Sequence, residues 1–270
     1  MAHTVEVNVV IQRRSAEIRG GTLAAAISMR AFLALFPITL LAIGAVGLVG
    51  GDPSSVAKSL ATALGLGHEF GRTLAKSIQT AESKRVLSSL LGILGLIWTG
   101  TGLAAAMATA WDAAWSTGGG VIRGRTLGTV WLIGGMAFLA VMVAISAALH
   151  DANVLIELGT MGGIIANSAF LFWTALLLPE RRLPWRAMVR PAIYGGIALE
   201  TLRAIGTNVV PALVRRSSTA YGTIGATFAL LVWLLFVGRV IVAAAIYERY
   251  RWEHRPPEAA DGAPEVVVTD

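Results

Sequence analysis

The sequence predicts an all-α polytopic membrane protein, a bundle of six transmembrane helices with short amphipathic helices in the first outer loop. Three observations lead to this fold class. Of the 270 residues, 55% are hydrophobic and only 14% are charged, against roughly 25% charged in a soluble domain. Apolar stretches of about 20 residues, long enough to cross hydrocarbon, recur along the chain. Arginine and lysine gather in the segments between these stretches.

The predicted spans follow one another closely, except after the first. They are Thr22–Gly50, Val86–Trp111, Thr126–His150, Val154–Leu178, Ala187–Val214 and Tyr221–Tyr247. The first span is expected to act as an uncleaved signal anchor, since no short apolar run with a cleavage site precedes it. The chain thus divides into a cytoplasmic N-terminal segment (1–21), a six-helix transmembrane domain (22–250) and a disordered cytoplasmic tail (251–270).

The distribution of basic residues predicts which side of the membrane each loop occupies. With the N-terminus inside, twelve Arg residues fall on the inner side and seven Arg or Lys residues on the outer side. The excess of inner charge places both termini in the cytoplasm. An even number of spans also requires that both termini lie on the same side of the membrane.

The long segment between the first two spans has its own pattern. After the turn at Asp52-Pro53, apolar residues recur at helical spacing on either side of a break at Gly65–Gly67. We expect two short amphipathic helices there, packed either on the lipid surface or over the mouth of the bundle.

Ionisable side chains within the spans are the strongest indication of function, because each costs roughly 2.5–3.5 kcal/mol at the membrane centre. The four residues of this kind are Arg30, Glu200, Arg203 and Arg239. Glu200 and Arg203 are three residues apart and share a helical face. Arginine keeps its proton, so three arginines against one carboxylate leave positive charge that must meet water, carbonyl groups or an anion.

These four residues predict an anion-binding cavity open to the cytoplasm, where guanidinium groups would hold a lipid phosphate or a carboxylated solute. The structural alternative is that Arg30 and Arg239 reach the inner headgroups while Glu200 pairs with Arg203. Pro37 interrupts the middle of the first span and is the candidate for a kink that serves gating.

Aromatic and small residues add packing expectations. Glycines at GxxxG spacing, such as Gly159 and Gly163, indicate close contact between helices. Four tryptophans fall near the predicted inner ends of spans, where they are expected to join an interfacial belt. They are Trp111, Trp115, Trp185 and Trp252.

The sequence contains no recognisable catalytic or cofactor motif. It has no cysteine, and its four histidines are scattered over predicted tails and outer loops. Neither a paired-histidine metal motif nor a phosphate-binding P-loop is present. The net charge of +6 fits loop topology better than nucleic-acid binding. We therefore expect no enzyme activity, no cofactor, no metal and no nucleic-acid partner.

Five short stretches of the sequence, taken in chain order, form a recognisable series. They read AFLALFP (31–37), LGLIWTGTG (94–102), LPERRLPW (178–185), LETLR (199–203), and YGT (221–223) followed by LLVWL (230–234). In order and spacing they resemble the AxFSLFP, GLLWSASG, LPNRRVPW, WELLK and YGS…LLLWL stretches of the bacterial YihY/BrkB/YhjD family of inner-membrane proteins. The likeness covers about residues 20–250. It departs from the family at Arg30 and Arg239, which replace a usual tyrosine and a usual apolar residue.

The resemblance implies a six-helix inner-membrane protein of unsettled activity. The family was formerly labelled ribonuclease BN, a label that this sequence does not support because it lacks a cluster of acidic or histidine residues for catalytic metals. The family is also linked to virulence, and its YhjD-like members, the branch that this chain resembles most, are linked to envelope lipid export.

Two functions follow as expectations. The first is an inner-membrane transporter or flippase for an anionic lipid or an envelope-related solute, not driven by nucleotide. The second is an accessory or scaffold membrane protein for envelope assembly, without transport activity of its own. Membrane lipids are the expected partners, and the sequence leaves open whether the protein forms a homo-oligomer.

Overall fold

The computed structural model describes residues 2–49, 85–116, 123–148, 156–179 and 185–254, and these residues are helical apart from short turns. The helices are α1 (Ala2–Glu17), α2 (Gly20–Val49), α5 (Arg85–Trp115), α6 (Arg123–Ala148), α7 (Ile156–Leu177) and α8 (Trp185–Glu253). The described chain contains no strand, which confirms the all-α prediction.

Within this part of the chain, five helical segments are long and apolar enough to cross a membrane. They are Gly20–Ile38, Leu90–Trp115, Gly159–Leu177, Met188–Ser217 and Ile224–Glu253. Five of the predicted spans therefore coincide with helical segments that are long and apolar enough to cross a membrane. The predicted span Thr126–His150 coincides with α6, where only Leu127–Phe138 qualifies, as a shorter apolar helix. A full crossing by α6 stays a prediction.

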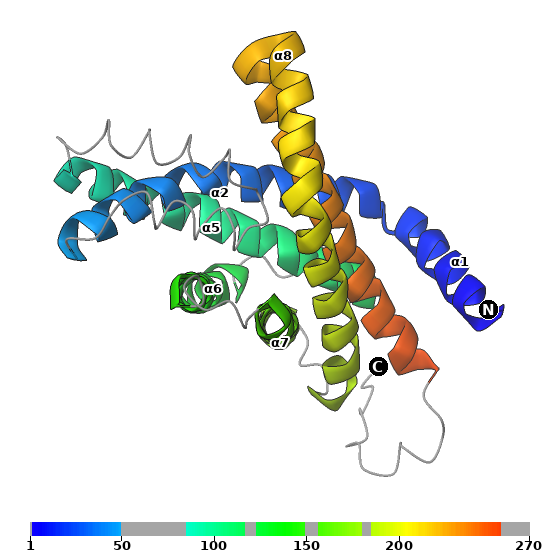
Figure 1. Cartoon of the computed structure of the whole chain (residues 1–270). Coiled ribbons are helices and arrows are strands. Elements are labelled where there is room, and N and C mark those ends of the chain that lie inside the picture. Colours follow the sequence, from blue (N-terminus) through cyan, green and yellow to red (C-terminus); the bar gives the residue numbers. More distant parts are fainter. Residues whose placement is uncertain (1, 50–84, 117–122, 149–155, 180–184, 255–270) are drawn as a thin grey trace.

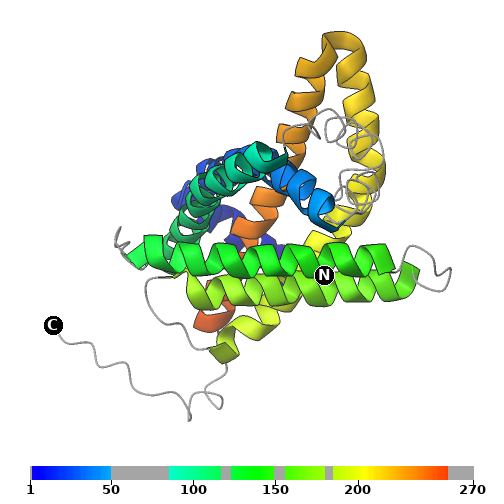
Figure 2. The same ribbon diagram turned by 90° about the vertical axis from the view of Figure 1, so that its left-hand side faces the viewer.

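Helix α8 contains both of the last two predicted spans. It is helical from Trp185 to Glu253, yet it turns back on itself and forms two antiparallel arms (Figures 1 and 2). At the turn Gly225 packs against the backbone carbonyl of Ser217, so closely that a side chain at position 225 would overlap that oxygen. We call residues 185–217 the first arm and residues 224–253 the second arm.

The helices form three antiparallel pairs that cross one another steeply. Figures 1 and 2 show α2 beside α5, α6 beside α7, and the two arms of α8 side by side. The sequence predicted a bundle of helices but not the angles at which its pairs cross. Hydropathy specifies the length of a span, whereas small residues at contact points determine how helices cross.

The crossing between α2 and the second arm of α8 illustrates such a contact. The hydroxyl of Ser28 donates hydrogen bonds to the carbonyls of Ala24 (2.6 Å) and Leu234 (2.8 Å). Gly238 lies so close to α2 that an added Cβ would be 2.5 Å from the Ala24 carbonyl oxygen. The two backbones can approach only because residue 238 has no side chain.

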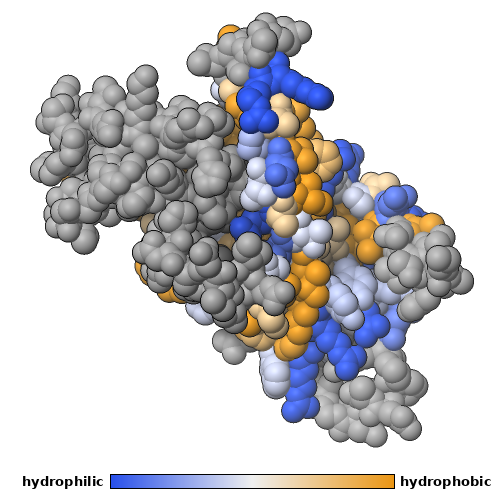
Figure 3. Space-filling view, viewed as in Figure 1, coloured by the Kyte–Doolittle hydropathy of each residue, from blue (hydrophilic) through white to orange (hydrophobic). Residues whose placement is uncertain are grey.

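The outer surface is strongly apolar. Phe36, Trp98 and Ile165 are 72%, 79% and 67% exposed, and many other large hydrophobic side chains are exposed on α2, α5, α7 and α8. Hydrophobic surface covers much of the length of α8, with hydrophilic surface toward its upper and lower ends in the view of Figure 3. Exposed apolar surface of this extent is typical of helices in contact with lipid tails.

The N-terminal segment forms a helix of its own. Between α1 and α2 the backbone at Arg19 takes a positive φ of 54°, which ends one helix and starts the next. Arg14 of α1 pairs with Glu253 at the end of α8 (2.5 Å). The two described ends of the chain therefore meet at the same end of the molecule.

Several predictions lie outside the described residues. The amphipathic helices expected over residues 52–85 belong to this group, apart from Arg85 itself, which begins α5. Of the tail expected to be disordered (251–270), residues 255–270 also lie outside them, whereas residues 251–253 belong to α8.

Candidate functional site

The first arm of α8 carries an ion pair in its middle. The carboxylate of Glu200 accepts hydrogen bonds from Nε of Arg203 at both oxygens (2.9 Å each), and Nη2 of Arg203 also donates to Oε1. The Glu200 side chain is 2% exposed and that of Arg203 is 24% exposed. The i, i+3 spacing thus brings the two residues together, as the shared helical face predicted.

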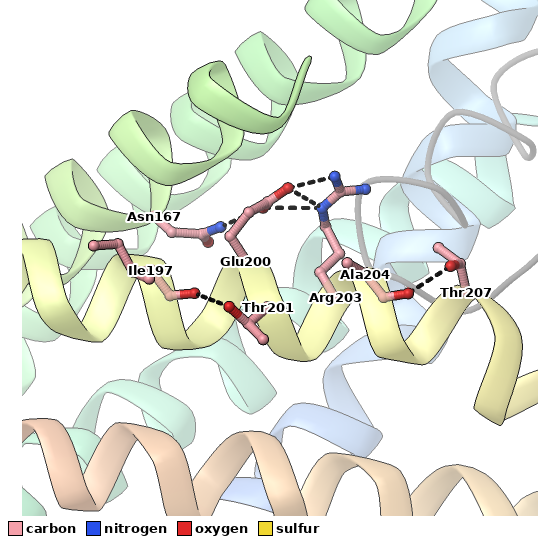
Figure 4. Close-up of polar contacts among 7 residues, drawn as sticks. All are labelled: Asn167, Ile197, Glu200, Thr201, Arg203, Ala204 and Thr207. Atoms are coloured by element: carbon pink, nitrogen blue, oxygen red, sulfur yellow. Dashed lines mark hydrogen bonds and ion pairs between the residues drawn. The ribbon is translucent and has the colours of Figure 1, made fainter. Parts of the chain in front are cut away.

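Helix α7 completes the surroundings of this carboxylate. Nδ2 of Asn167 donates to Oε2 of Glu200 (3.1 Å), and Figure 4 shows the amide reaching the carboxylate from the neighbouring helix. Gly163, one turn earlier on α7, leaves the space that the carboxylate fills, because an added Cβ would be 2.5 Å from Cδ of Glu200. Gly163 therefore makes room for a polar contact, whereas no described atom lies within 4 Å of a Cβ added at Gly159, the other glycine of the predicted GxxxG pair.

The ion pair borders a cavity of about 300 Å³ at the meeting point of the helix pairs. Every described helix except α1 contributes to its wall. The polar side chains that line it are those of Asn167 and Arg203, together with Trp131, which is apolar except for its indole N–H. The remaining lining residues are apolar or glycine, among them Leu103 of α5, Met136 of α6 and Trp233 of α8. The indole N–H of Trp131 donates to the Thr174 hydroxyl (3.0 Å) and is satisfied within the protein.

This arrangement differs from the predicted anion site. Arg30 and Arg239 are exposed and do not line the cavity. The guanidinium of Arg30 lies against Gly102 of α5, on the outside of the α2–α5 pair. Of the four charged residues, the structure brings together Glu200 and Arg203 only. Because they neutralise each other, the cavity carries no excess positive charge from them.

Pro37 is buried within α2, which continues on both sides of it. Its ring packs against Gly95 of α5, where an added Cβ would be 3.1 Å from the proline Cβ. The proline therefore takes part in the α2–α5 contact, and its role in gating stays a prediction.

Sequence reasoning missed a second buried carboxyl group. Glu248 in the second arm of α8 is fully buried, and its Oε2 accepts a hydrogen bond from Nε1 of Trp111 (2.9 Å). The predicted sixth span ended at Tyr247, one residue earlier, so Glu248 was not counted as a membrane residue. Trp111 and Trp115 are 0% and 6% exposed. The expectation that these two tryptophans form part of an interfacial belt is therefore wrong.

In the described residues, no three His, Asp or Glu side chains come together in a way that could hold a metal ion. The site therefore consists of an apolar cavity, a neutralised ion pair with its amide partner, and a separate buried carboxyl group. Its wall is suited to contact with an apolar chain, and its ion pair to contact with a polar group.

Comparison with known families assigns the chain. The family model described as "Virulence factor BrkB" matches residues 11–266, nearly the whole sequence. No curated protein and no solved structure gives a match. The family match agrees with the sequence stretches noted above and with the several apolar helices. The chain is therefore a membrane protein of the BrkB virulence factor family.

Proposed function

We propose that this protein transports a membrane lipid between the two leaflets, without using nucleotide, and that the cavity receives part of the lipid. The observation that carries the proposal is a cavity of about 300 Å³ with an almost wholly apolar wall and one ion pair at its edge. This volume lies at the lower end of the range for ligand pockets. It suits a segment of a single acyl chain rather than a whole two-chain lipid.

The ion pair supplies the polar contact that such a lipid needs. Nη1 of Arg203 makes no hydrogen bond to any described residue, and the Arg203 side chain is partly exposed. A lipid phosphate would bind this free edge of the guanidinium, since arginine forms paired hydrogen bonds with phosphate. Glu200 keeps the guanidinium neutralised when no lipid is present, which lowers the cost of holding it inside the membrane.

A reconstitution experiment tests the proposal. The purified chain is placed in liposomes that contain fluorescent phosphatidylglycerol or phosphatidylethanolamine, and dithionite reports how much of the probe reaches the outer leaflet. We expect faster exchange than in protein-free liposomes, with the anionic lipid preferred. Exchange no faster than in protein-free liposomes would refute lipid transport.

Two variants locate the activity. Arg203→Gln removes the guanidinium at the cavity and should slow exchange of the anionic lipid at least tenfold. Arg190→Gln removes an exposed arginine of the same arm, away from the cavity lining, and should change the rate less than twofold. Equal rates of lipid exchange in the two variants would show that transport does not use the proposed site.

Arg30 and Arg239 are tested in the same assay. Neither has a hydrogen bond or ion pair among the described residues, and neither lines the cavity. If they help to select anionic headgroups from the outer surface of the protein, Arg30→Gln and Arg239→Gln should each weaken the preference for anionic lipid. An unchanged preference for anionic lipid would mean that these two arginines anchor the protein at the membrane interface instead.

The alternative is a scaffold that binds other membrane proteins of envelope assembly. One observation favours it: Gly159 and Gly162 on α7 have no described atom near the position of an added Cβ. Such an open small-residue face can accept a partner helix. Specific copurification of an envelope enzyme, lost in Gly159→Leu, together with no lipid exchange in liposomes, would favour this second function.

A further inference from the structure

A carboxyl group without a counter-charge lies where α5 contacts the second arm of α8, far from the turn of α8. This group is the side chain of Glu248. Glu248 is 0% exposed and is surrounded by Trp111, Trp115 and the main apolar core. Its single hydrogen bond comes from the neutral indole of Trp111, and its Oε1 has no partner among the described residues. Nε1 of Trp115 is also buried without a partner.

Of the cations near Glu248 in the chain, Arg251 interacts electrostatically with Tyr247, and Arg249 is bound to other groups. Arg249 donates to Oε1 of Glu253 (2.6 Å) and to the backbone carbonyl of Trp115. Arg14 of α1 pairs with Oε2 of Glu253 (2.5 Å). Glu253 thus takes both guanidinium groups, and Glu248 takes neither.

The helices packed around Glu248 bring no further counter-charge. Arg13 of α1 pairs with Glu17, and the charged residue of α2, Arg30, is exposed beside Gly102. On α5 the nearest titratable residue is Asp112, which has an interaction of its own and carries negative charge when ionised.

The first arm of α8 and helix α7 also bring no counter-charge to Glu248. Arg186 lies over the ring of Trp185 and Arg190 is exposed. Tyr194 contacts Tyr247 edge to face, and Tyr250 stacks on Tyr247. Residues 159–177 of α7 contain no charged side chain. None of these groups forms an ion pair with Glu248.

An ionised carboxylate in this position would be costly, because burial of a charge without a partner is among the largest penalties in proteins. A protonated carboxyl avoids most of that cost. We propose that Glu248 is a proton-binding site, occupied at neutral pH, at the contact between α5 and the second arm of α8.

The two tryptophans give the site two states. With the proton bound, the carboxyl is neutral and accepts the Trp111 hydrogen bond at Oε2; its O–H, at Oε1, has no acceptor among the described residues, which costs less than a buried unpaired charge. When the proton leaves to water, the carboxylate gains a negative charge, and the unpartnered indole N–H of Trp115 is the nearest available second donor. Loss of the proton therefore favours a shift of the Trp115 end of α5 toward Glu248.

The site is connected to the cavity by the same two helices. Ile241 of α8 and Leu103 of α5 line the cavity, and they precede Glu248 and Trp111 by about 10–12 Å along their helices. A change in the α5–α8 contact at Glu248 would therefore reach the cavity wall. This consequence rests on the proposed transport function, whereas proton binding itself does not.

Infrared difference spectroscopy of the full-length protein in nanodiscs tests the proposal. At neutral pH the wild type should show the C=O stretch of a protonated carboxyl, shifted by deuterium exchange and lost as the pH is raised. Glu248→Gln should remove this band. Glu17→Gln, at an exposed and paired glutamate, and Asp112→Asn, at the neighbouring acid of α5, should leave it unchanged.

Two further outcomes decide the matter even if Glu248→Gln does not fold. Trp111→Phe removes the hydrogen-bond donor and should shift the carboxyl band to higher frequency. Absence of any protonated carboxyl band in the wild type at neutral pH would overturn the proposal, as would a band that persists unshifted in Glu248→Gln or in Trp111→Phe.

Discussion

Gly163 and Glu200 form a contact in which the absence of a side chain makes room for a charge. An alanine at position 163 would overlap the carboxylate of Glu200 and push it away from Arg203 or Asn167. Gly162→Ala is a matched control, because nothing lies within 4 Å of an added Cβ there. We expect Gly163→Ala to lower the free energy of unfolding by about 1–3 kcal/mol, measured as a lower Tm in detergent, and Gly162→Ala to leave Tm unchanged or slightly raised. Equal effects would contradict the contact.

The ion pair makes an asymmetric prediction. Arg203→Gln leaves a carboxylate that is 2% exposed without a cation, whereas Glu200→Gln leaves a guanidinium that is 24% exposed and can reach the cavity or headgroups. We expect Arg203→Gln to destabilise by up to about 3 kcal/mol and Glu200→Gln by less. The double variant should be more stable than the sum of the single effects predicts, which chemical unfolding of all four proteins measures. Additive effects would show that the residues do not interact.

At the residue scale, local spacing determined what could be predicted. Glu200 and Arg203 share a helix, so their contact follows from i, i+3 geometry. Asn167 lies on another helix, and no local pattern points to it. Glu248 was missed because it follows the last residue assigned to the sixth span, although a burial argument applied one residue further would have included it.

At the scale of elements, the contact between α2 and α8 depends on small residues. An alanine at Gly238 would place a methyl group 2.5 Å from the Ala24 carbonyl oxygen and press on Ser28. We expect Gly238→Ala to separate the two helices and to lower Tm, at a cost of about 1–3 kcal/mol. Gly21→Ala, where an added Cβ meets nothing within 4 Å, is the control. A Tm for Gly238→Ala equal to that of the control would mean that the helices do not cross there.

Hydropathy predicted the positions of most helices but not their ends or joints. The last two spans were expected as separate helices, yet α8 is helical from Trp185 to Glu253 and folds back near Gly225. The polar stretch 215–220 separates the two predicted spans at this joint, and Gly222 and Gly225 follow it, but nothing there predicts that the helix continues through the turn. The segment before the first span is polar and has no apolar pattern, so no helix was predicted there. Helix α1 forms in this segment and contacts the far end of the chain through Arg14 and Glu253.

At the scale of the whole molecule, the structure brings the two described ends together and separates them from the turn of α8 (Figure 1). The chain has no cysteine, so single cysteines can be labelled without a background. We expect Gln12→Cys and His254→Cys to react with a membrane-impermeant maleimide only after the cell is opened, and Arg216→Cys to react in intact spheroplasts. Labelling of residues 12 and 254 from opposite sides would contradict an even number of crossings.

The cavity is a property of the whole molecule, which explains why the sequence predicted it only in part. A polar cavity near Glu200 and Arg203 was expected, with Arg30 and Arg239 in its wall. Three helix pairs that cross steeply instead place apolar residues of five helices around it and leave both arginines outside. Depth along each span could be estimated from the sequence, but the direction in which each face points depends on how the pairs cross.

Blocking the cavity tests the central claim most directly. Leu103 and Leu94 lie on the same helix, α5; Leu103 lines the cavity, whereas Leu94 is 65% exposed on the outer surface. In the liposome exchange assay, Leu103→Trp should slow lipid exchange at least fivefold because the indole fills the space for the acyl chain, and Leu94→Trp should keep the wild-type rate. Equal rates in two well-folded variants would contradict a lipid path through this cavity.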